Sequence, residues 1–169
     1  MTQHCPAFAR MHSDRDRDRF VRELLHELTG LLEETVGLEE AEGFIALVGN
    51  RIGNAMNAEY RAAAGTPQLS RDQVAEALVD LKRRIRGGFA IDSIDPDRIV
   101  LTNTACPFGR YVAGRRSLCM MTSNVFGRIA AANLGYARVT LDQTIAEGHD
   151  GCRVVVHFNE GEDGRAYFG

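Results

Sequence analysis

The sequence predicts an α+β fold, in which N-terminal helices pack on an antiparallel sheet of about four strands with an inserted helix. Two observations lead to this fold class. Apolar residues recur at helical spacing through the first half of the chain, and after Gly87-Gly88 the pattern changes to short β-branched runs separated by turns. The 169 residues suit one domain, which we divide into a disordered leader, residues 1–12, and a single domain, residues 13–169.

The first helix is expected to follow Ser13, a candidate N-cap with Asp16 at the capping-box position, and to stop at Gly37. Its apolar positions are Phe20, Leu24, Leu25, Leu28, Leu31, Leu32 and Val36. They form a stripe that is wide enough to supply an intramolecular core, so the stripe does not require a partner.

The second helix is expected over residues 38–63. Gly49 and Gly53 lie four residues apart on it, and each weakens the helix by roughly 1 kcal/mol relative to alanine. We therefore expect another helix to approach closely there, with tolerated sequence drift as the alternative. A third helix opens at a second capping box, which is formed by Ser70 and Gln73.

The second half of the chain is typical of strands with one helix between them. Strands are expected over residues 89–94, 99–102, 136–141 and 152–158, and residues 165–168 are a candidate edge strand. A helix is expected over residues 117–134, where Gly135 ends it.

Composition limits the classes of function. A net charge of −3 argues against a dedicated nucleic-acid-binding protein, because such proteins usually carry a basic face. No apolar run approaches the ~18 residues of a membrane span, and the N-terminus has no apolar segment of signal-peptide length. We therefore expect a cytoplasmic protein without direct contact to nucleic acid or membrane. Lys82 is the only lysine, which we interpret as genome composition without a mechanism.

The common catalytic motifs are missing from the sequence. It contains no GxGxxG after a strand, no GxxxxGK[ST], no GxSxG, no HExxH and no CxxC pair. Phosphate cradling, serine hydrolysis by a triad and zincin chemistry therefore have no support.

Four cysteines in a cytoplasmic chain are more often thiols or metal ligands than disulfides. Cys106, Cys119 and Cys152 lie near the ends of three expected elements, where side chains can converge beside a sheet edge. Three thiolates and the imidazole of His149 would complete a tetrahedral zinc site. Cys5 lies in the leader and is assigned no role.

Two alternatives remain open for the cysteines. They can be small buried hydrophobic residues, as free cysteines usually are. Cys106, which precedes Pro107 in a loop, can also be a nucleophile whose pKa is lowered by His149 or His157, although no third orienting residue is evident.

Four stretches carry a resemblance to a known family. They are Cys106–Gly109, Leu118–Ala131, Leu134–Val139 and Ile145–Cys152. These stretches resemble the methanogen output domain, a small prokaryotic signalling module. They are more distantly similar to 4-vinyl-reductase-type domains, which have an α+β fold and bind small molecules. The resemblance covers about residues 20–158.

The resemblance implies a ligand-sensing or signal-output domain with a cysteine cluster. It also strengthens the expectation of a metal, either zinc or an iron-containing centre. Phenol-sensing members of the vinyl-reductase-type group hold zinc with a Glu and a Cys shortly before the last cysteine. This chain has Leu141-Asp-Gln-Thr144 in that stretch, and His149 stands where an Asp is common. A metal site in this chain would therefore differ from theirs.

The leading hypothesis is a signalling or transcription-regulating module that binds a small molecule between helix 117–134 and the sheet. An apolar lining is typical of ligand pockets, although each lining residue can also be ordinary core. The expected lining residues are Phe108, Met121, Val125, Phe126 and Tyr136.

Two further hypotheses belong to other classes. One is a metal-dependent or cysteine-dependent enzyme that acts on a small hydrophobic or heterocyclic substrate, with Glu147, Asp150 and His157 as candidate bases. The other is a structural domain that dimerises through the apolar stripe over residues 20–36. We expect a homodimer, with a signalling protein as another partner.

Overall fold

The computed structural model describes residues 10–169, so most of the expected leader, with Cys5, lies outside the described residues. The helices of the first half are α2 (Arg17–Val36), α3 (Leu38–Ala64) and α4 (Arg71–Arg84). The elements of the second half are β1 (Phe89–Ile94), β2 (Arg98–Asn103), η1 (Gly109–Val112), α5 (Arg116–Leu134), β3 (Tyr136–Gln143), η2 (Ile145–Glu147), β4 (Cys152–His157) and β5 (Arg165–Phe168). The expected α+β fold class is confirmed.

The sheet has five strands in the order β1-β2-β4-β3-β5, and every neighbouring pair is antiparallel. The fifth strand, one more than the four expected, is the candidate edge strand at the C-terminal tail. It pairs with only the first half of β3, from Tyr136 to Val139, so the second half of β3 has no strand beside it on that edge.

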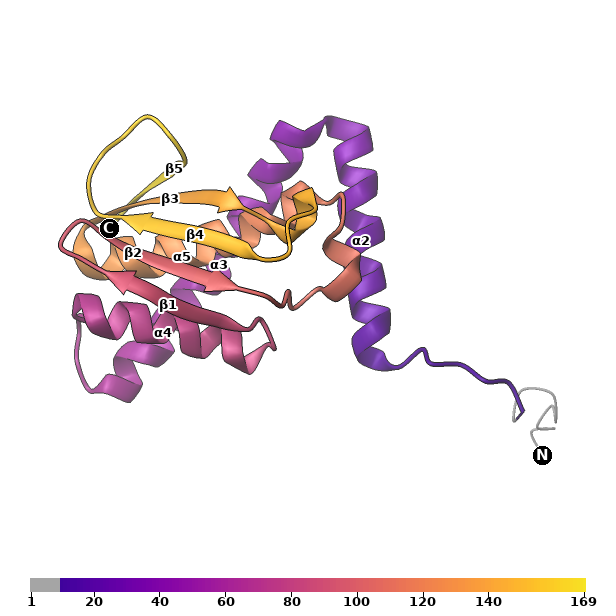
Figure 1. Cartoon of the computed structure of the whole chain (residues 1–169), viewed down its shortest axis with the longest axis horizontal. Helices are drawn as coiled ribbons and strands as arrows, with labels where there is room; N and C mark the ends of the chain where they lie inside the picture. Colours follow the sequence, from indigo (N-terminus) through magenta and orange to yellow (C-terminus); the bar gives the residue numbers. More distant parts are fainter. Residues whose placement is uncertain (1–9) are drawn as a thin grey trace.

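Helices α4 and α5 pack on one face of the sheet, and Figure 1 shows α4 beside β1, α5 behind the central strands and α2 beyond the ends of the strands. Helix α3 packs on α5 rather than on the sheet, and α2 packs on α3 and on η1. Within residues 10–169, no helix is both long and apolar enough to cross a membrane.

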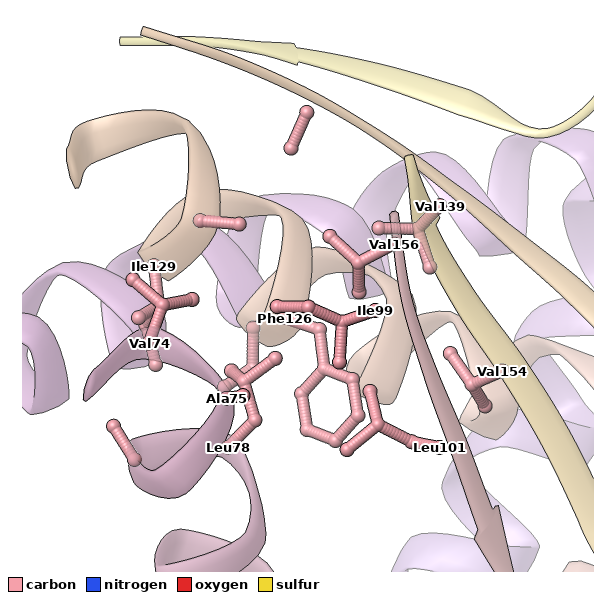
Figure 2. Close-up of a cluster of buried hydrophobic side chains, with 14 of the residues drawn as sticks. Val74, Ala75, Leu78, Ile99, Leu101, Phe126, Ile129, Val139, Val154 and Val156 are labelled. Atoms are coloured by element: carbon pink, nitrogen blue, oxygen red, sulfur yellow. The ribbon is translucent and has the colours of Figure 1, made fainter. Parts of the chain in front are cut away.

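The main core fills the space between the sheet and the two helices α4 and α5. Figure 2 shows the ring of Phe126 between α4 and the strands, and its side chain is fully buried. The fully buried neighbours from α4, β2, β3 and β4 include Val74, Leu78, Ile99, Leu101, Val139, Val154 and Val156.

The predicted use of the two glycines on α3 is confirmed. A Cβ at Gly49 would lie 2.6 Å from the Cβ of Asn124, and one at Gly53 would lie 3.0 Å from the Cβ of Arg128. Both contacts are with α5, so small residues on α3 allow the two helices to approach closely.

The two expected N-caps have different outcomes. Ser70 forms the predicted capping box, because its Oγ accepts from the Gln73 backbone at 3.3 Å while the Gln73 side chain accepts from Ser70 N. Ser13 is not the cap of α2. The helix begins at Arg17, so Asp16 occupies the cap position and its carboxylate accepts from Arg19 N at 2.7 Å.

Candidate functional site

Three cysteines from separate elements line one pocket. Cys106 lies in the loop after β2, Cys119 in the first turns of α5 and Cys152 at the start of β4. We call this site the thiol pocket. It is lined by the three cysteines, by Thr122 and by mainly apolar side chains that include Phe89, Phe108, Val112, Leu118 and Ala146. Its cavity has a volume of about 30 Å³.

His149, the expected fourth member of the cluster, does not line the thiol pocket. Gly148, with a φ of +92°, turns the chain after η2, and the side chain of His149 is exposed. Within residues 10–169, no group of three or more His, Cys, Asp or Glu side chains is arranged to hold a metal ion. A zinc or iron-containing centre therefore stays a prediction, which elemental analysis of the purified protein tests.

The five expected ligand contacts lie in different places. Phe108 lines the thiol pocket. Val125 and Phe126 are buried in the main core, and Met121 packs against that core. The ring of Tyr136 lies edge-on to Phe168, with centroids 5.6 Å apart. The residues of α5 that line the pocket are Leu118, Cys119 and Thr122, so the pocket lies nearer the start of this helix than expected.

Burial keeps two of the pocket cysteines, Cys106 and Cys119, as neutral thiols. Burial raises the pKa of Cys119 to about 12. Burial also raises the pKa of Cys106, against the opposing effect of backbone hydrogen bonds from Phe108 and Gly109. A thiolate is the reactive form of cysteine, so these two side chains act as weak S–H donors rather than as nucleophiles near neutral pH.

A buried amide fixes the walls of the thiol pocket. Asn103 Nδ2 donates to the carbonyls of Gly87 at 3.1 Å and Ala105 at 2.8 Å, and its Oδ1 accepts from Cys152 N at 2.9 Å. These bonds join the end of β2 to the start of β4 and to the loop that carries Cys106. Asn103 was not among the predicted site residues, because its partners are distant in sequence.

Lys82, which was not among the predicted site residues, does not itself line the thiol pocket but contacts the lining residue Thr122. Its side chain is only 4% exposed, and its Nζ donates to Thr122 Oγ1 at 2.7 Å. The Nζ lies 5.5 Å and 5.3 Å from the ring centroids of Phe89 and Phe126. Burial lowers the pKa of Lys82 to about 8, while electrostatic interaction with the three pocket cysteines acts in the opposite direction.

An open polar groove adjoins the thiol pocket where β5 stops short along β3. The groove has a volume of about 760 Å³ and is lined by charged side chains from α3, α5, β3 and β5. It shares Cys119, Leu141 and Thr144 with the thiol pocket. The apolar pocket therefore lies directly beside an open groove with a charged lining.

The pocket wall also contacts α2. Tyr111 lies in η1, between the pocket residues Phe108 and Val112. Its carbonyl lies 2.8 Å from His26 Nδ1, and its hydroxyl donates to Glu23 Oε1 at 3.2 Å. A displacement of this wall would therefore reach α2 directly.

Comparison with known proteins supports the fold and gives the family. A solved structure of trafficking protein particle complex subunit 3 from Naegleria fowleri, covalently bound to palmitic acid, superimposes with a TM-score of 0.63 at 13% identity. The match covers 84% of this chain and 97% of that chain. No curated protein matches the sequence. The model of methanogen output domain 1 matches residues 24–157, and the chain therefore belongs to that family.

Proposed function

We propose that this chain is a regulatory module that binds a small, largely apolar molecule in the thiol pocket. The observation that carries the proposal is the pocket itself, in which an apolar lining with few polar groups is built from three separate elements. The family is described as an output domain. The structural neighbour from Naegleria fowleri holds palmitic acid, which supports an acyl chain or a molecule of similar shape.

Binding requires the pocket to open. Ligand pockets commonly have volumes of about 300–1,000 Å³, whereas the thiol pocket has about 30 Å³. The loop from Cys106 to Arg115 is the wall with the least regular structure, and Phe108 and Val112 are its apolar members. We expect this loop to move outward on binding, with the polar groove as the entry path.

The moving wall gives the module an output. Tyr111 lies in the same loop and contacts α2 through its carbonyl and its hydroxyl. A ligand that displaces Phe108 would therefore change the contacts of α2. A ligand can affect a second site only if the contacts of that site differ between the ligand-free and the ligand-bound state.

The outer face of α2 and α3 is the surface that this output would reach. Helix α2 turns polar side chains inward, among them Thr29 and Glu33, the latter accepting from Ser117 Oγ. Most of its large apolar side chains are exposed, as are several of α3. This apolar face consists of Phe20, Val21, Leu24, Leu28, Leu31, Val36, Leu38, Phe44, Leu47, Val48 and Ile52, which are 38–62% exposed.

A second copy of this chain is the occupant we propose for the apolar face. At about half exposure each side chain leaves roughly 80 Å² in water, so the face offers on the order of 800 Å², the area that one partner contributes to a standard interface. Glu27 and Glu34 on α2 and Arg51 on α3 border the face. None of the three has an ion-pair partner within residues 10–169. A two-fold arrangement brings opposite charges from such a border together.

The ligand site is tested with octan-1-ol, a neutral apolar probe, by titration calorimetry. We expect the wild-type chain to bind it and Ala146→Phe to lose binding, because the new ring fills the cavity. The matched control is Ala62→Phe on the exposed face of α3, outside the pocket, which should bind as the wild type does.

A second variant keeps the test decisive if Ala146→Phe does not fold. Phe108→Ala removes one apolar wall from a loop, and we expect the affinity for octan-1-ol to fall about tenfold, as one lost aromatic contact implies. Wild-type affinity in both pocket variants, or no binding by the wild type, would overturn the proposed site.

A further inference from the structure

We propose that the ligand of the thiol pocket is an organic carboxylate, whose anionic group is held by the ammonium of Lys82 and the hydroxyl of Thr122. The inference rests on the proposed function and names the chemical class of its ligand. It is carried by one buried cation, by the hydrogen-bond donors that face the cavity and by the apolar surroundings of both.

Lys82 is a buried cation without an acidic partner. Within residues 10–169 no carboxylate lies within ion-pair distance of its Nζ, and the rings of Phe89 and Phe126 occupy two of its sides. A charge buried in this way is costly unless an opposite charge joins it. Lys82 is the only lysine of the chain. A free anion bound beside it would supply the opposite charge that its side chain lacks.

Thr122 connects Lys82, which is not a lining residue, to the wall of the cavity. Its Oγ1 accepts the hydrogen bond from Lys82 Nζ at 2.7 Å, and Thr122 itself lines the thiol pocket. Because the oxygen accepts from Lys82, the hydroxyl proton remains for another acceptor, and no acceptor for it lies among residues 10–169. This proton is available to a ligand oxygen.

The other polar groups at the cavity act as donors or are already satisfied. The thiols of Cys106 and Cys119 keep their protons near neutral pH because the pocket is apolar. The amide nitrogen of Asn103 donates to two backbone carbonyls, and the hydroxyl of Thr144 donates to Glu147. A cavity with spare donors and one nearby positive charge complements an acceptor with a single negative charge.

A carboxylate fits this pattern better than a phosphate. A phosphate monoester carries up to two negative charges near neutral pH, whereas Lys82 supplies one positive charge and no arginine lines the pocket. The remaining lining is apolar and suits a hydrocarbon body. On binding, the carboxylate exchanges its hydrogen bonds with water for bonds from Lys82 and Thr122. The hydrocarbon takes the place of the loop side chains that move outward.

The experiment compares octanoate with octanamide and octan-1-ol by titration calorimetry at pH 7. We expect the wild-type chain to bind octanoate at least tenfold more tightly than either neutral probe. Lys82→Met and Thr122→Val should each reduce this preference severalfold or more while octan-1-ol still binds. Arg71→Met is the matched control, because it removes a cation that lies 5.4 Å from the ring of Phe158, outside the pocket.

Each outcome separates the inference from the proposed function. Equal binding of octanoate and octan-1-ol by the wild type would overturn the carboxylate and leave the apolar site standing. Binding of neither probe would overturn the proposed function and the inference with it. A carboxylate preference that survives both Lys82→Met and Thr122→Val would place the anion elsewhere. If Lys82→Met does not fold, Thr122→Val and the loss of preference above pH 8 still decide the matter.

Discussion

Replacing Lys82 with methionine is expected to raise the free energy of unfolding at pH 7 by about 2 kcal/mol. The pKa of Lys82 is lowered by burial from 10.5 to about 8, and such a shift corresponds to a cost of about 3 kcal/mol for the buried charge. The lost hydrogen bond to Thr122 offsets about 1 kcal/mol of that gain. Methionine keeps the packing of the stem, and sulfur–aromatic contacts of its thioether replace the cation–π contacts with Phe89 and Phe126.

The stabilising effect of Lys82→Met is expected to decrease as the pH rises. Between about pH 8 and 10.5 the unfolded chain binds a proton at Lys82 that the folded chain has lost, so stability contributed by this residue rises with pH in that window. Urea unfolding at pH 7 and pH 9 should therefore show the advantage of Lys82→Met shrinking as pH rises. An advantage that stays constant, or a variant less stable than the wild type at both pH values, would mean that the ammonium is compensated in the folded protein.

Introducing a charge into the apolar face should dissociate the proposed homodimer. Leu28 and Phe44 are 57% and 52% exposed, so Leu28→Asp and Phe44→Asp should fold normally. In a two-fold interface each substitution occurs twice, and burying two unpaired carboxylates costs several kcal/mol, which weakens the dimer by roughly a thousandfold. Sedimentation velocity over the micromolar range measures the effect.

The control for the dimer is Ile91→Asp on β1, which lies outside the apolar face and is 37% exposed. It should leave the wild-type sedimentation unchanged. A wild-type chain that is monomeric throughout this range would contradict the second copy as the occupant. A dimer that persists in both face variants would place the interface elsewhere.

Much of the fold could be predicted from the sequence because local signals and global packing agree. Glycines end α2, α3 and α5, and alternation with β-branched runs marks β3 and β4. Gly49 and Gly53 even indicated the close contact with α5. The width of the apolar stripe of α2 left two uses open, an intramolecular core and a dimer interface. In the structure most of the stripe is exposed while Thr29 and Glu33 face inward, an orientation that tertiary contacts such as Glu33 with Ser117 determine.

The site could be predicted only in part, for a similar reason. Cys106, Cys119 and Cys152 lie near the ends of three elements, and this placement correctly predicted that they share one pocket. The turn at Gly148, in contrast, leaves His149 exposed. Lys82 precedes two arginines at the end of α4 and has the pattern of a solvated helix end. The direction in which the Lys82 side chain points depends on how α4 packs against α5. Its status as the only lysine was the one available signal.

The most direct test of the thiol pocket as the ligand site is the alkylation rate of its cysteines. Iodoacetamide labelling, followed peptide by peptide in the mass spectrometer, should be measured with and without saturating octanoate or octan-1-ol, whichever binds. We predict that the rate changes at Cys106, Cys119 and Cys152 together, because the occupant lies among them and moves their shared wall. Unchanged rates at all three cysteines while the probe is bound would contradict the account.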